Sequence, residues 1–394
     1  MSKNRVIVFT DHFRPARAAG GIITSLENLF SEIGKKENFI VISGNRDLGS
    51  KISIVKFVNR WYKQENVRVL YKLSIHNIFL IISIALNKKN KRFILPSFFS
   101  PLGTILPLIT LRIRKMIYGE TDVIIIIFAR GQLFSNAFLV RSKKKNRYLK
   151  IAKLFSLLSG ANLIYSSAYE LEKSVLASKH FDLTETIIPD MLSNKFFYDN
   201  INVTHPSLTR NIDEDFINVL CVGRIHRIKR IHKVVHFLQN LNCALKIKIN
   251  ICGPIEDKNY WHEILSDLNN DKIVLNFMDT LNGEDLKSQY LKSDILCVFS
   301  KTENFSYVVP EALSLGCPVI LTNGVYWSGF SSDCILCISE NFNASDSLAA
   351  TKYINSIYHN RFLYSQLSRS FLKFYISKHQ AKYIFDFHRL LTVK

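Results

Sequence analysis

A recurring order of apolar runs, loops and helical repeats is the feature that most restricts the fold of this chain. Residues 5–10, RVIVFT, form a short apolar run rich in β-branched side chains, which is typical of a buried strand. A loop follows at DHFRPARAAGG, and apolar residues then recur at helical spacing from Ile22 to Ile33. Another apolar run begins at Phe39. This strand, loop, helix and strand order predicts a parallel α/β domain.

The same order starts again in the second half of the chain. INVLCVG at 217–223 is a predicted strand, and apolar residues from Ile231 to Leu241 mark a helix. Between the two series, residues 188–215 contain Pro189 and many polar side chains, which is typical of a connector. The sequence therefore predicts two successive doubly wound α/β domains. We expect their ligand at the carboxyl ends of the strands, facing a cleft between the domains.

Composition restricts the class of partner. The chain has 394 residues, with 52 Lys and Arg against 32 Asp and Glu, and a formal net charge of +20. Such an excess favours anionic partners: nucleic acid, phosphorylated small molecules or an anionic lipid surface. The hydrophobic fraction of 47% excludes a disordered chain, and the length suits two domains of ordinary size.

Cysteine usage and apolar stretches bear on the compartment. All seven cysteines lie in the second half, and their odd number cannot pair completely, so we expect a reduced, cytoplasmic environment. Cys334 and Cys337 form a single C-x-x-C without a second ligand pair, which favours packing over a metal site. Residues 93–111 are uncharged and long enough for a membrane span, but three prolines and Gly103 predict a strand, a loop and a helix instead.

Two loops have the character of phosphate-binding segments. In VGRIHRIKR, at 222–230, Gly223 permits a tight turn after a strand, and Arg224 and Lys229 can converge on one anionic group. In the first half, Gly20 and Gly21 precede a helix whose first N–H groups are free to bind an anion. The chain has neither a Walker sequence nor G-x-G-x-x-G, which argues against ATP hydrolysis and dinucleotide binding.

Two carboxylates stand eight positions apart in apolar surroundings. Glu303 follows a predicted strand, and Glu311 begins the next helical segment, where the helix dipole stabilises its charge. Each can accept hydrogen bonds from a pair of sugar hydroxyls. Placed opposite Arg224 and Lys229, they would form a site with a polyol end and a diphosphate end, which is the shape of a nucleotide sugar.

These motifs resemble those of the retaining glycosyltransferases with the GT-B fold, family 4. VGRIHRIK is similar to the G-R-x-x-x-x-K signature of that family, and ENFSYVVPEALSLGCPVI is similar to its E-x7-E signature. INICGPIED resembles the strand and glycine turn between them, and FARGQLFSNAFLVRSKKK resembles a P-R-G segment of bacterial polysaccharide transferases. The resemblance implies two facing Rossmann-like domains with a cleft between them: an acceptor-side domain at 1–195, a nucleotide-sugar domain at 216–370, and a segment at 371–394 that crosses back to the first domain.

The resemblance also implies roles for single residues. Glu311 would hold the nucleotide ribose, Glu303 would face the donor sugar, and Arg224 and Lys229 would stabilise the departing diphosphate, so no metal or other cofactor is expected. The remaining expected contacts with the donor come from Gly223, Asn304, Phe305, Ser306, Gly20 and Gly21. On the acceptor side the resemblance points to Arg130 and Gly131.

Three positions depart from the family pattern. Ser306 stands where the family usually has glycine three residues after the first glutamate, and Arg230 replaces a common glycine after the lysine. Ala129 occupies the position of the proline in the P-R-G segment. None of these changes removes a charged group that the mechanism needs.

The expected function is retaining transfer of a sugar from a nucleotide sugar to a glycan acceptor, lipid-linked, in the synthesis of O-antigen, capsule or exopolysaccharide. The basic segments 112–115 and 141–147 would contact anionic lipid on the inner face of the cytoplasmic membrane. Two other readings stay open: a basic nucleic-acid-binding protein, although the basic residues are scattered and form no recognised module, and a non-catalytic protein of envelope assembly.

Overall fold

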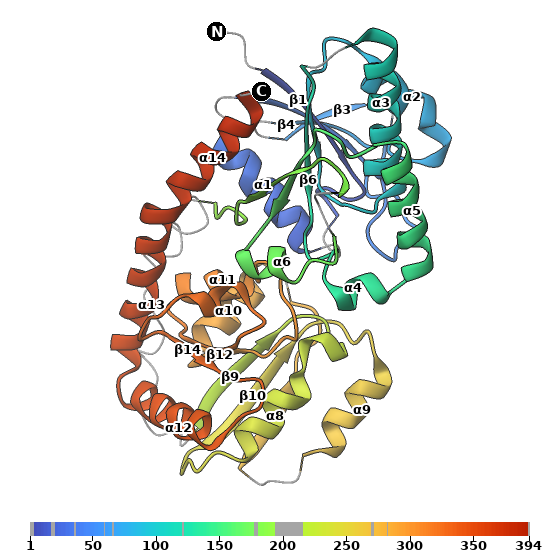
Figure 1. Cartoon of the computed structure of the whole chain (residues 1–394). Helices are drawn as coiled ribbons and strands as arrows, with labels where there is room; N and C mark the ends of the chain where they lie inside the picture. The colour runs from blue at the N-terminus through green and yellow to red at the C-terminus, as the bar shows by residue number, and fades with distance from the viewer. Residues whose placement is uncertain are drawn as a thin grey trace. The chain divides into compact units, whose positions relative to one another are not determined.

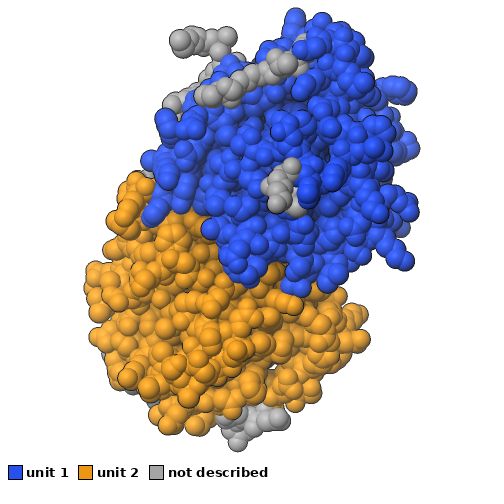
Figure 2. All heavy atoms as spheres, viewed as in Figure 1, with its two compact units in different colours: residues 1–194, 379–394 blue, residues 195–378 orange. Residues whose placement is uncertain are grey.

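The computed structural model describes residues 4–16, 20–34, 37–58, 60–64, 67–119, 122–176, 180–193, 216–268, 272–281 and 283–392. The chain divides into two compact units (Figure 2): residues 1–194 together with 379–394, and residues 195–378. The second unit extends past the expected boundary at 370, because helix α13 (Arg361–Tyr375) continues without a break across it. Most of the expected connector, residues 194–215, lies outside the described residues.

An eight-stranded sheet forms the centre of the first unit (Figure 1). Its strand order is β3-β4-β2-β1-β5-β6-β7-β8, and the described pairings are parallel except for β3 with β4. The strands are β1 (Asn4–Thr10), β2 (Glu37–Ser43), β3 (Trp61–Gln64), β4 (Val67–Leu70), β5 (Arg92–Leu95), β6 (Ile124–Phe128), β7 (Asn162–Tyr165) and β8 (Thr184–Ile187). The predicted strands at 5–10, at Phe39 and in 93–111 are confirmed.

Alternating side chains of β1 supply two separate cores on the two faces of this sheet. Val6 and Val8 pack with residues of α1 (Gly21–Ile33) and α14 (Ala381–Thr392), whereas Ile7 and Phe9 pack with the helices of the opposite face. That opposite layer contains α2 (Ile78–Leu86), α3 (Leu106–Tyr118) and α5 (Ser142–Leu154), as Figure 1 shows. The shorter helices are α4 (Ser135–Leu139) and α6 (Ala168–Glu172).

The last helix of the chain is part of the first unit. Phe387 of α14 stacks on Phe128 of β6 with ring centroids 6.0 Å apart, and the Arg92 Nε donates to the Leu391 carbonyl at 2.6 Å. Just before the helix, the Gln380 side chain exchanges two hydrogen bonds with the backbone of Leu192. The first unit is therefore completed by the C-terminal end of the chain.

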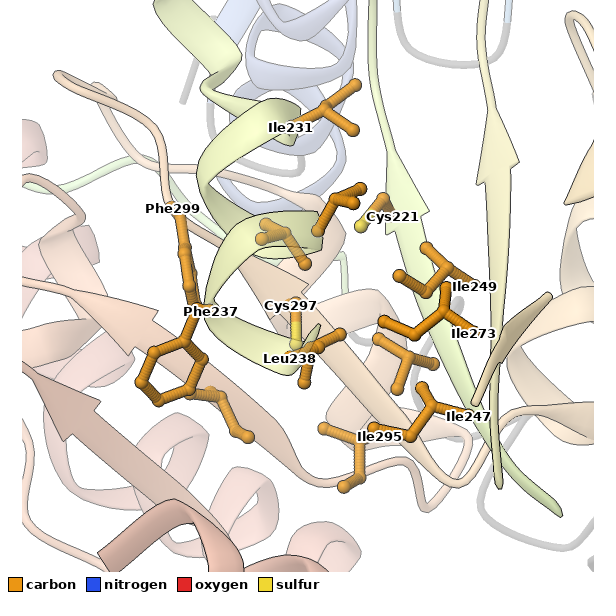
Figure 3. Close-up of a cluster of buried hydrophobic side chains, with 14 of the residues drawn as sticks. Cys221, Ile231, Phe237, Leu238, Ile247, Ile249, Ile273, Ile295, Cys297 and Phe299 are labelled. Atoms are coloured by element: carbon orange, nitrogen blue, oxygen red, sulfur yellow. The ribbon is translucent and has the colours of Figure 1, made fainter. Parts of the chain in front are cut away.

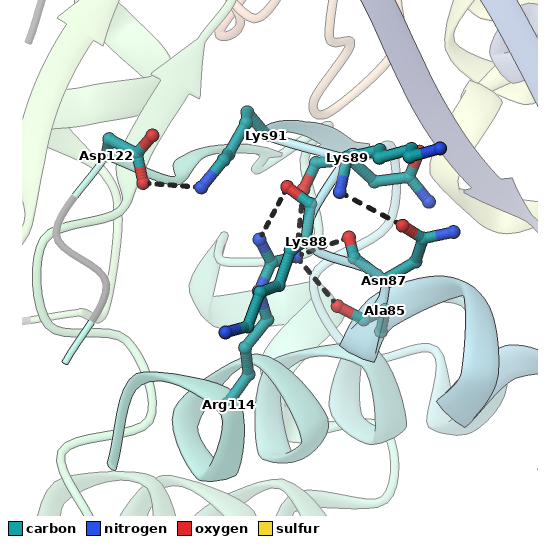
Figure 4. A network of polar contacts seen from close by, with 8 residues as sticks. Ala85, Asn87, Lys88, Lys89, Lys91, Arg114 and Asp122 are labelled. Atoms are coloured by element: carbon teal, nitrogen blue, oxygen red, sulfur yellow. Dashed lines mark hydrogen bonds and ion pairs between the residues drawn. The ribbon is translucent and has the colours of Figure 1, made fainter. Parts of the chain in front are cut away.

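Arg114 fixes the packing of α3 on α2 (Figure 4). Its side chain is fully buried, and its Nη1 donates to the carbonyls of Ala85, Asn87 and Asn90 at 2.8–3.0 Å. A guanidinium at the C-terminal end of a helix satisfies free carbonyls and is favoured by the helix dipole. The expectation that the whole basic segment 112–115 faces lipid is therefore wrong for Arg114. Among the described residues, no helix has the length and apolarity needed to cross a membrane.

The second unit has a six-stranded parallel sheet with the order β11-β10-β9-β12-β13-β14. Numbered within the unit, this is the order 3-2-1-4-5-6 of a Rossmann domain. The strands are β9 (Phe216–Val222), β10 (Lys246–Cys252), β11 (Ile273–Phe277), β12 (Ile295–Val298), β13 (Val319–Thr322) and β14 (Ile335–Ile338). The helices are α8 (Ile231–Gln239), α9 (Lys258–Ser266), α10 (Gly283–Lys292), α11 (Val308–Ser314), α12 (Ala344–His359) and α13. The predicted doubly wound domain is confirmed here.

A continuous apolar core holds α8 against this sheet (Figure 3). Phe237 and Leu238 of the helix pack with Ile249 and Ile295 of the strands, all at most 2% exposed. Cys221 and Cys297 are part of the same core, which agrees with a packing role for these thiols. All seven cysteines are free, and Cys337 alone among them is exposed.

The order of strands places the two predicted motifs side by side. Strand β9 pairs with β10 on one side and with β12 on the other, where Val219 lies opposite Ile295. The chain leaving β9 crosses to one face and the chain leaving β12 returns to the other, and ligands of open α/β sheets bind at such a switch point. The basic loop follows β9 and the loop with Glu303 follows β12.

Candidate functional site

Two glycines allow the loops after β9 and β10 to touch. Gly223 has φ +140°, and its N–H donates to the Cys252 carbonyl at 2.9 Å. A Cβ on Gly253 would lie 2.0 Å from the Gly223 oxygen, and a Cβ on Gly223 would lie 3.2 Å from Cε of Lys229. Larger residues at either position would therefore push the loops apart and move Lys229.

Lys229 and Glu303 join the loops that follow β9 and β12. The Lys229 ammonium contacts the Glu303 carboxylate, and the Ser300 hydroxyl donates to the same carboxylate oxygen at 2.7 Å. Both charged side chains are largely buried, with 22% and 14% of their surface exposed. The Lys301 N–H also donates to the Ile228 carbonyl at 2.9 Å, so the two loops are held together by backbone and side chain.

The other cations of the basic loop also have acidic partners. Nη1 of Arg224 lies 3.0 and 2.9 Å from the two carboxylate oxygens of Glu256, which follows β10. Arg230 pairs with Glu340 at 2.8 Å, and Arg227 contacts Glu263. These ion pairs fix the direction of each cation and neutralise much of the loop's charge. A diphosphate that bound here would compete with carboxylates for Arg224 and Lys229.

Glu311 lies in the first turn of α11, the helix that follows Glu303. Its Oε2 accepts a hydrogen bond of 2.8 Å from the hydroxyl of Tyr290, a buried residue of α10. Burial raises the pKa of Glu311 to about 7, and the hydrogen bond from Tyr290 opposes this rise. The carboxyl is thus poised to change its charge near neutral pH, while part of the residue remains accessible to solvent.

The segment between the two glutamates is mostly buried. The ring of Phe305 is 1% exposed and packs between Tyr307, Tyr326 and Trp327, while its carbonyl accepts a 2.7 Å hydrogen bond from Trp327 Nε1. The side chain of Phe305 is therefore part of the core, and only backbone of this residue is left for a ligand. Asn304, next to it, is partly exposed.

Ser306 has an unfavourable backbone and an unfavourable side-chain environment. Its φ is +60°, a left-handed conformation that costs a non-glycine residue about 1–2 kcal/mol. The residue is 9% exposed, and its hydroxyl oxygen is buried without a hydrogen-bond partner. A buried, unsatisfied hydroxyl costs a further ~1–3 kcal/mol.

In the first unit, Arg130 lies against the first turn of α1. Its Nη2 donates to Ser25 Oγ at 2.8 Å and its Nη1 to the Ile22 carbonyl at 3.4 Å, and Ser25 in turn donates to Asp190. Gly20, with φ +57°, precedes the same helix, so the structure brings Arg130 and the glycine turn together. Residues 17–19 of that turn lie outside the described residues.

Gly131 has a clear structural role. Its φ is +71°, and its N–H donates to the carboxyl of Glu170, which is fully buried and also accepts from the Ser166 backbone and hydroxyl. Burial raises the pKa of Glu170 above its usual range, against the effect of these hydrogen bonds. The glycine thus helps to fix the loop after β6 that carries Arg130.

Comparison with known proteins relates part of the second unit to a described family. Residues 209–329 match the family model of glycosyl transferases group 1, and this range includes the basic loop, both glutamates and Ser306. A glycosyltransferase of Methanocaldococcus jannaschii is 26% identical over 113 residues, and this match spans 28% of each chain.

Solved structures share the architecture along nearly the whole chain. Anabaena HepE in complex with UDP superimposes with a TM-score of 0.66 and 13% identity, covering 98% of this chain and 99% of that one. WaaG, a glycosyltransferase involved in lipopolysaccharide biosynthesis, gives a TM-score of 0.59 at 13% identity, covering 94% and 95%. With its two Rossmann-like units, the chain has the GT-B fold.

Two departures from the group 1 pattern fall on left-handed backbone. Ser306 has φ +60° and Arg230 has φ +51°, at the two positions where the resemblance implies glycine. Glycine adopts such conformations without strain. Arg230 gains an ion pair with Glu340 in return, whereas the hydroxyl of Ser306 gains no hydrogen bond among the described residues.

Several residues that contact the motif residues were not predicted from the sequence. Glu256 stands in the quoted segment INICGPIED, but its pairing with Arg224 depends on the adjacency of β9 and β10. Tyr290 donates a hydrogen bond to Glu311, and Ser300 donates one to Glu303. Neither residue belongs to a motif that the sequence reveals: Tyr290 lies in helix α10 and Ser300 follows strand β12. Nδ1 of His232, in α8, lies 2.8 Å from the hydroxyl of Tyr260.

Proposed function

We propose that this protein is a retaining glycosyltransferase that moves a sugar from a nucleoside-diphosphate sugar to a glycan acceptor. The observation that carries the proposal is the meeting of Lys229 and Glu303 at the point where β9 and β12 diverge. Arg224 belongs to the same loop as Lys229, and Glu311 to the helix that follows Glu303. We therefore assign the diphosphate end of the site to the loop after β9 and the polyol end to the segment after β12.

The proposed division of labour follows from charge and hydrogen-bonding capacity. Arg224 and Lys229 bind the diphosphate and stabilise the negative charge that develops as it leaves. Glu311 accepts hydrogen bonds from the ribose hydroxyls, and Glu303 faces the sugar and its developing positive charge. Because two fixed cations stabilise the leaving group, the reaction needs no divalent metal, and addition of EDTA tests this point.

Retention requires the acceptor hydroxyl to approach on the face that the diphosphate leaves. The bond from the anomeric carbon to the phosphate oxygen breaks, and the bond to the acceptor oxygen forms on the same side. The departing phosphate takes the proton of the acceptor hydroxyl. The protein contributes positioning and electrostatic stabilisation, and Arg130, fixed at the first turn of α1, is the proposed contact with the acceptor.

The proposed acceptor is a lipid-linked glycan of the cell envelope, used at the inner face of the cytoplasmic membrane. The similarity to WaaG supports an envelope role. The exposed surface of α3 and α5, in the layer opposite α1, carries the apolar and basic side chains that we propose contact an anionic membrane. We call it the α3–α5 face and define it by its exposed apolar residues Ile113, Met116, Ile117, Ile151, Leu154 and Phe155 and its exposed basic residues Lys115, Lys143, Lys144, Arg147, Lys150 and Lys153.

The segment 141–147 contributes to this face as part of a helix, since α5 begins at Ser142. Lys145 is turned inward and donates to the Ala137 carbonyl, and burial lowers its pKa from the usual value. The neighbouring lysines remain exposed beside apolar side chains. Apolar insertion combined with attraction to anionic lipid is how peripheral helices bind membranes.

A transfer assay tests the proposal. Purified protein is incubated with a radiolabelled nucleotide sugar and a lipid-linked acceptor fraction, and label in the lipid phase is measured for the wild type, Glu303→Ala and Arg224→Ala. We expect transfer by the wild type and a loss of at least about 100-fold in each variant. Nuclear magnetic resonance of the anomeric proton then compares donor and product. An inverted product, or near-normal transfer by both variants, contradicts the proposal.

A further inference from the structure

The guanidinium of Arg130 is held from several sides, although the backbone of this residue is strained. Nη2 donates to Ser25 Oγ at 2.8 Å, Nη1 donates to the Ile22 carbonyl at 3.4 Å, and the guanidinium carbon lies 4.8 Å from the centre of the Phe128 ring. The backbone of Arg130 has φ +46°, a left-handed conformation that residues other than glycine seldom adopt. A side chain fixed this closely on a strained backbone is expected where its direction matters for function.

The hydroxyl of Ser25 links this guanidinium to a carboxylate. The hydroxyl oxygen accepts from Arg130, and the hydroxyl proton is donated to Oδ1 of Asp190 at 2.5 Å. Ser25 is 3% exposed and Asp190 is 9% exposed, so both members of this second bond are shielded from water. Hydrogen bonds to charged groups are stronger than those between neutral groups, and a buried setting strengthens them further. The three side chains therefore form one chain of charge-assisted hydrogen bonds.

Asp190 lies in the segment 188–193, which follows β8 and comes just before the first unit ends at residue 194. Two side chains of α1 anchor this segment. Ser25 donates to Asp190, and Nδ2 of Asn28 donates to the Met191 carbonyl at 2.9 Å. The first anchor continues to Arg130, whereas the second joins a side chain to a backbone carbonyl. The two anchors hold the same segment to the same helix, and they differ in their connection to the proposed acceptor contact.

We infer that Asp190 is a positioning residue for Arg130 and acts through the hydroxyl of Ser25. The carboxylate draws the hydroxyl proton towards itself, so the lone pairs of the hydroxyl oxygen face the guanidinium and fix it at the first turn of α1. The inference rests on the proposed function, in which Arg130 contacts the acceptor. Neither Ser25 nor Asp190 is proposed to touch a substrate, so their replacement should affect transfer through the direction of Arg130.

Four single variants test the inference. Ser25→Ala cuts the chain of hydrogen bonds, and Asp190→Asn keeps the shape and an accepting oxygen but removes the charge. Ser25→Thr keeps the hydroxyl, and a cavity of about 10 Å³ that Ser25 and Asp190 line leaves room for the added methyl group. Asn28→Ala is the matched control, because it removes the other anchor between α1 and the same segment. The melting temperature of each protein is recorded.

The first measurement needs no substrate. Phenylglyoxal modifies accessible guanidinium groups, and mass spectrometry of the peptide that contains Arg130 follows its rate of modification. We expect the rate at Arg130 to rise about 10-fold in Ser25→Ala, the scale of a lost hydrogen bond to a charged group, and by a smaller factor in Asp190→Asn. Ser25→Thr restores the wild-type rate, and Asn28→Ala leaves the rate within about twofold of the wild type.

The second measurement repeats the transfer assay over a range of concentrations of the lipid-linked acceptor fraction. We expect the acceptor KM to rise about 10-fold in Ser25→Ala and less in Asp190→Asn, while the KM for the nucleotide sugar stays as in the wild type. In an Arg130→Ala background neither change should raise the acceptor KM further, because residues that act as one unit are not additive. Asn28→Ala should keep the acceptor KM of the wild type.

The outcomes that overturn the inference differ from those that overturn the proposed function. Equal effects of Asn28→Ala and Ser25→Ala on the modification rate, or additive losses in the Arg130→Ala background, overturn the positioning role and leave the transferase proposal standing. A wild-type acceptor KM in Arg130→Ala overturns the acceptor contact, and the inference with it, but not the donor site. A wild-type protein that transfers no sugar overturns the proposed function, and the modification rates then still decide whether Asp190 positions Arg130.

Discussion

Lys229 and Glu303 neutralise each other across two loops of the second unit. The ammonium that is proposed to bind the diphosphate contacts the carboxylate that is proposed to face the sugar, and Ser300 holds the same carboxylate at 2.7 Å. The pair orders both side chains before a ligand arrives. It also means that a diphosphate has to share Lys229 with Glu303 or displace it.

Replacement of Glu303 by Gln separates binding from transfer. The change keeps the size of the side chain and releases Lys229, so we expect affinity for the cognate nucleoside diphosphate to rise several-fold at low salt. Transfer should fall by at least about 100-fold, because the charge opposite the developing positive sugar is lost. Calorimetry and a single-turnover assay measure the two effects. Glu340→Gln, which frees Arg230 in the same loop, is the control and should change neither by more than about twofold.

Replacing Arg224 and replacing its partner Glu256 should change diphosphate binding in opposite directions. Their ion pair is partly exposed, with 52% and 35% of the side chains accessible, so it contributes little to stability. Arg224→Ala should weaken diphosphate binding and slow transfer by about 100-fold, whereas Glu256→Gln should strengthen binding by about twofold to fivefold. The calorimetric titration is repeated at low and high salt. Weaker binding by Glu256→Gln would contradict the competition described here.

The raised pKa of Glu311 predicts a pH dependence of nucleotide binding. If only the carboxylate accepts the ribose hydroxyls, a pKa of about 7 makes affinity rise about tenfold between pH 6 and pH 8. Glu311→Gln should bind weakly at both pH values. Tyr290→Phe removes the hydrogen bond that lowers this pKa, so the midpoint should move to higher pH. Affinity that does not vary with pH in the wild type would refute this role.

The titration of Glu311 also makes the free energy of unfolding depend on pH. The folded protein holds the Glu311 proton more tightly than the unfolded chain, whose carboxyl titrates near 4.5. The free energy of unfolding contributed by Glu311 is therefore largest below about pH 4.5 and is lost as pH rises to about 7. Urea titrations between pH 5 and pH 8 should show this loss in the wild type, and its absence in Glu311→Gln.

The α3–α5 face predicts selective binding to anionic vesicles. Met116 and Ile117 are 81% and 62% exposed, so Met116→Glu with Ile117→Glu should leave the fold intact and remove apolar insertion. We expect at least about tenfold weaker co-sedimentation with phosphatidylglycerol vesicles, and weak binding to phosphatidylcholine in all cases. Leu348→Glu, a change of a 57% exposed residue in the second unit, is the control. Equal binding by the double variant would place the membrane contact elsewhere.

Much of the fold was predictable because buried parallel strands have a strong signal. The runs at 5–10 and 217–223 are apolar on both faces, and helical spacing follows each of them. The hairpin of β3 and β4 was not predicted, because β3 is a four-residue edge strand whose side chains are partly or fully exposed. Strand β14 was not predicted, because its sequence, ILCI, was interpreted only as part of a C-x-x-C motif.

The charged residues of the candidate site were predictable from the sequence, whereas the residues that pair with them were not. Arg224, Lys229, Glu303 and Glu311 carry a spaced signature that one sequence can reveal. Their partners depend on which strands are neighbours, since Glu256 reaches Arg224 only because β10 lies beside β9. The left-handed backbone of Ser306 could not be predicted from the sequence, because serine seldom adopts this conformation.

A thermal-shift panel tests the central claim, a donor site formed by the loops after β9 and β12, most directly. Wild-type protein and Glu311→Ala are melted with UDP, GDP, dTDP, CMP and their sugar conjugates, with and without EDTA. A ligand at about 100 times its dissociation constant adds roughly 2.7 kcal/mol of stability, which is readily measured. We predict that one nucleotide family raises the melting temperature of the wild type, that EDTA changes nothing, and that Glu311→Ala loses the shift. No shift with any nucleotide, or an equal shift in Glu311→Ala, would contradict the account.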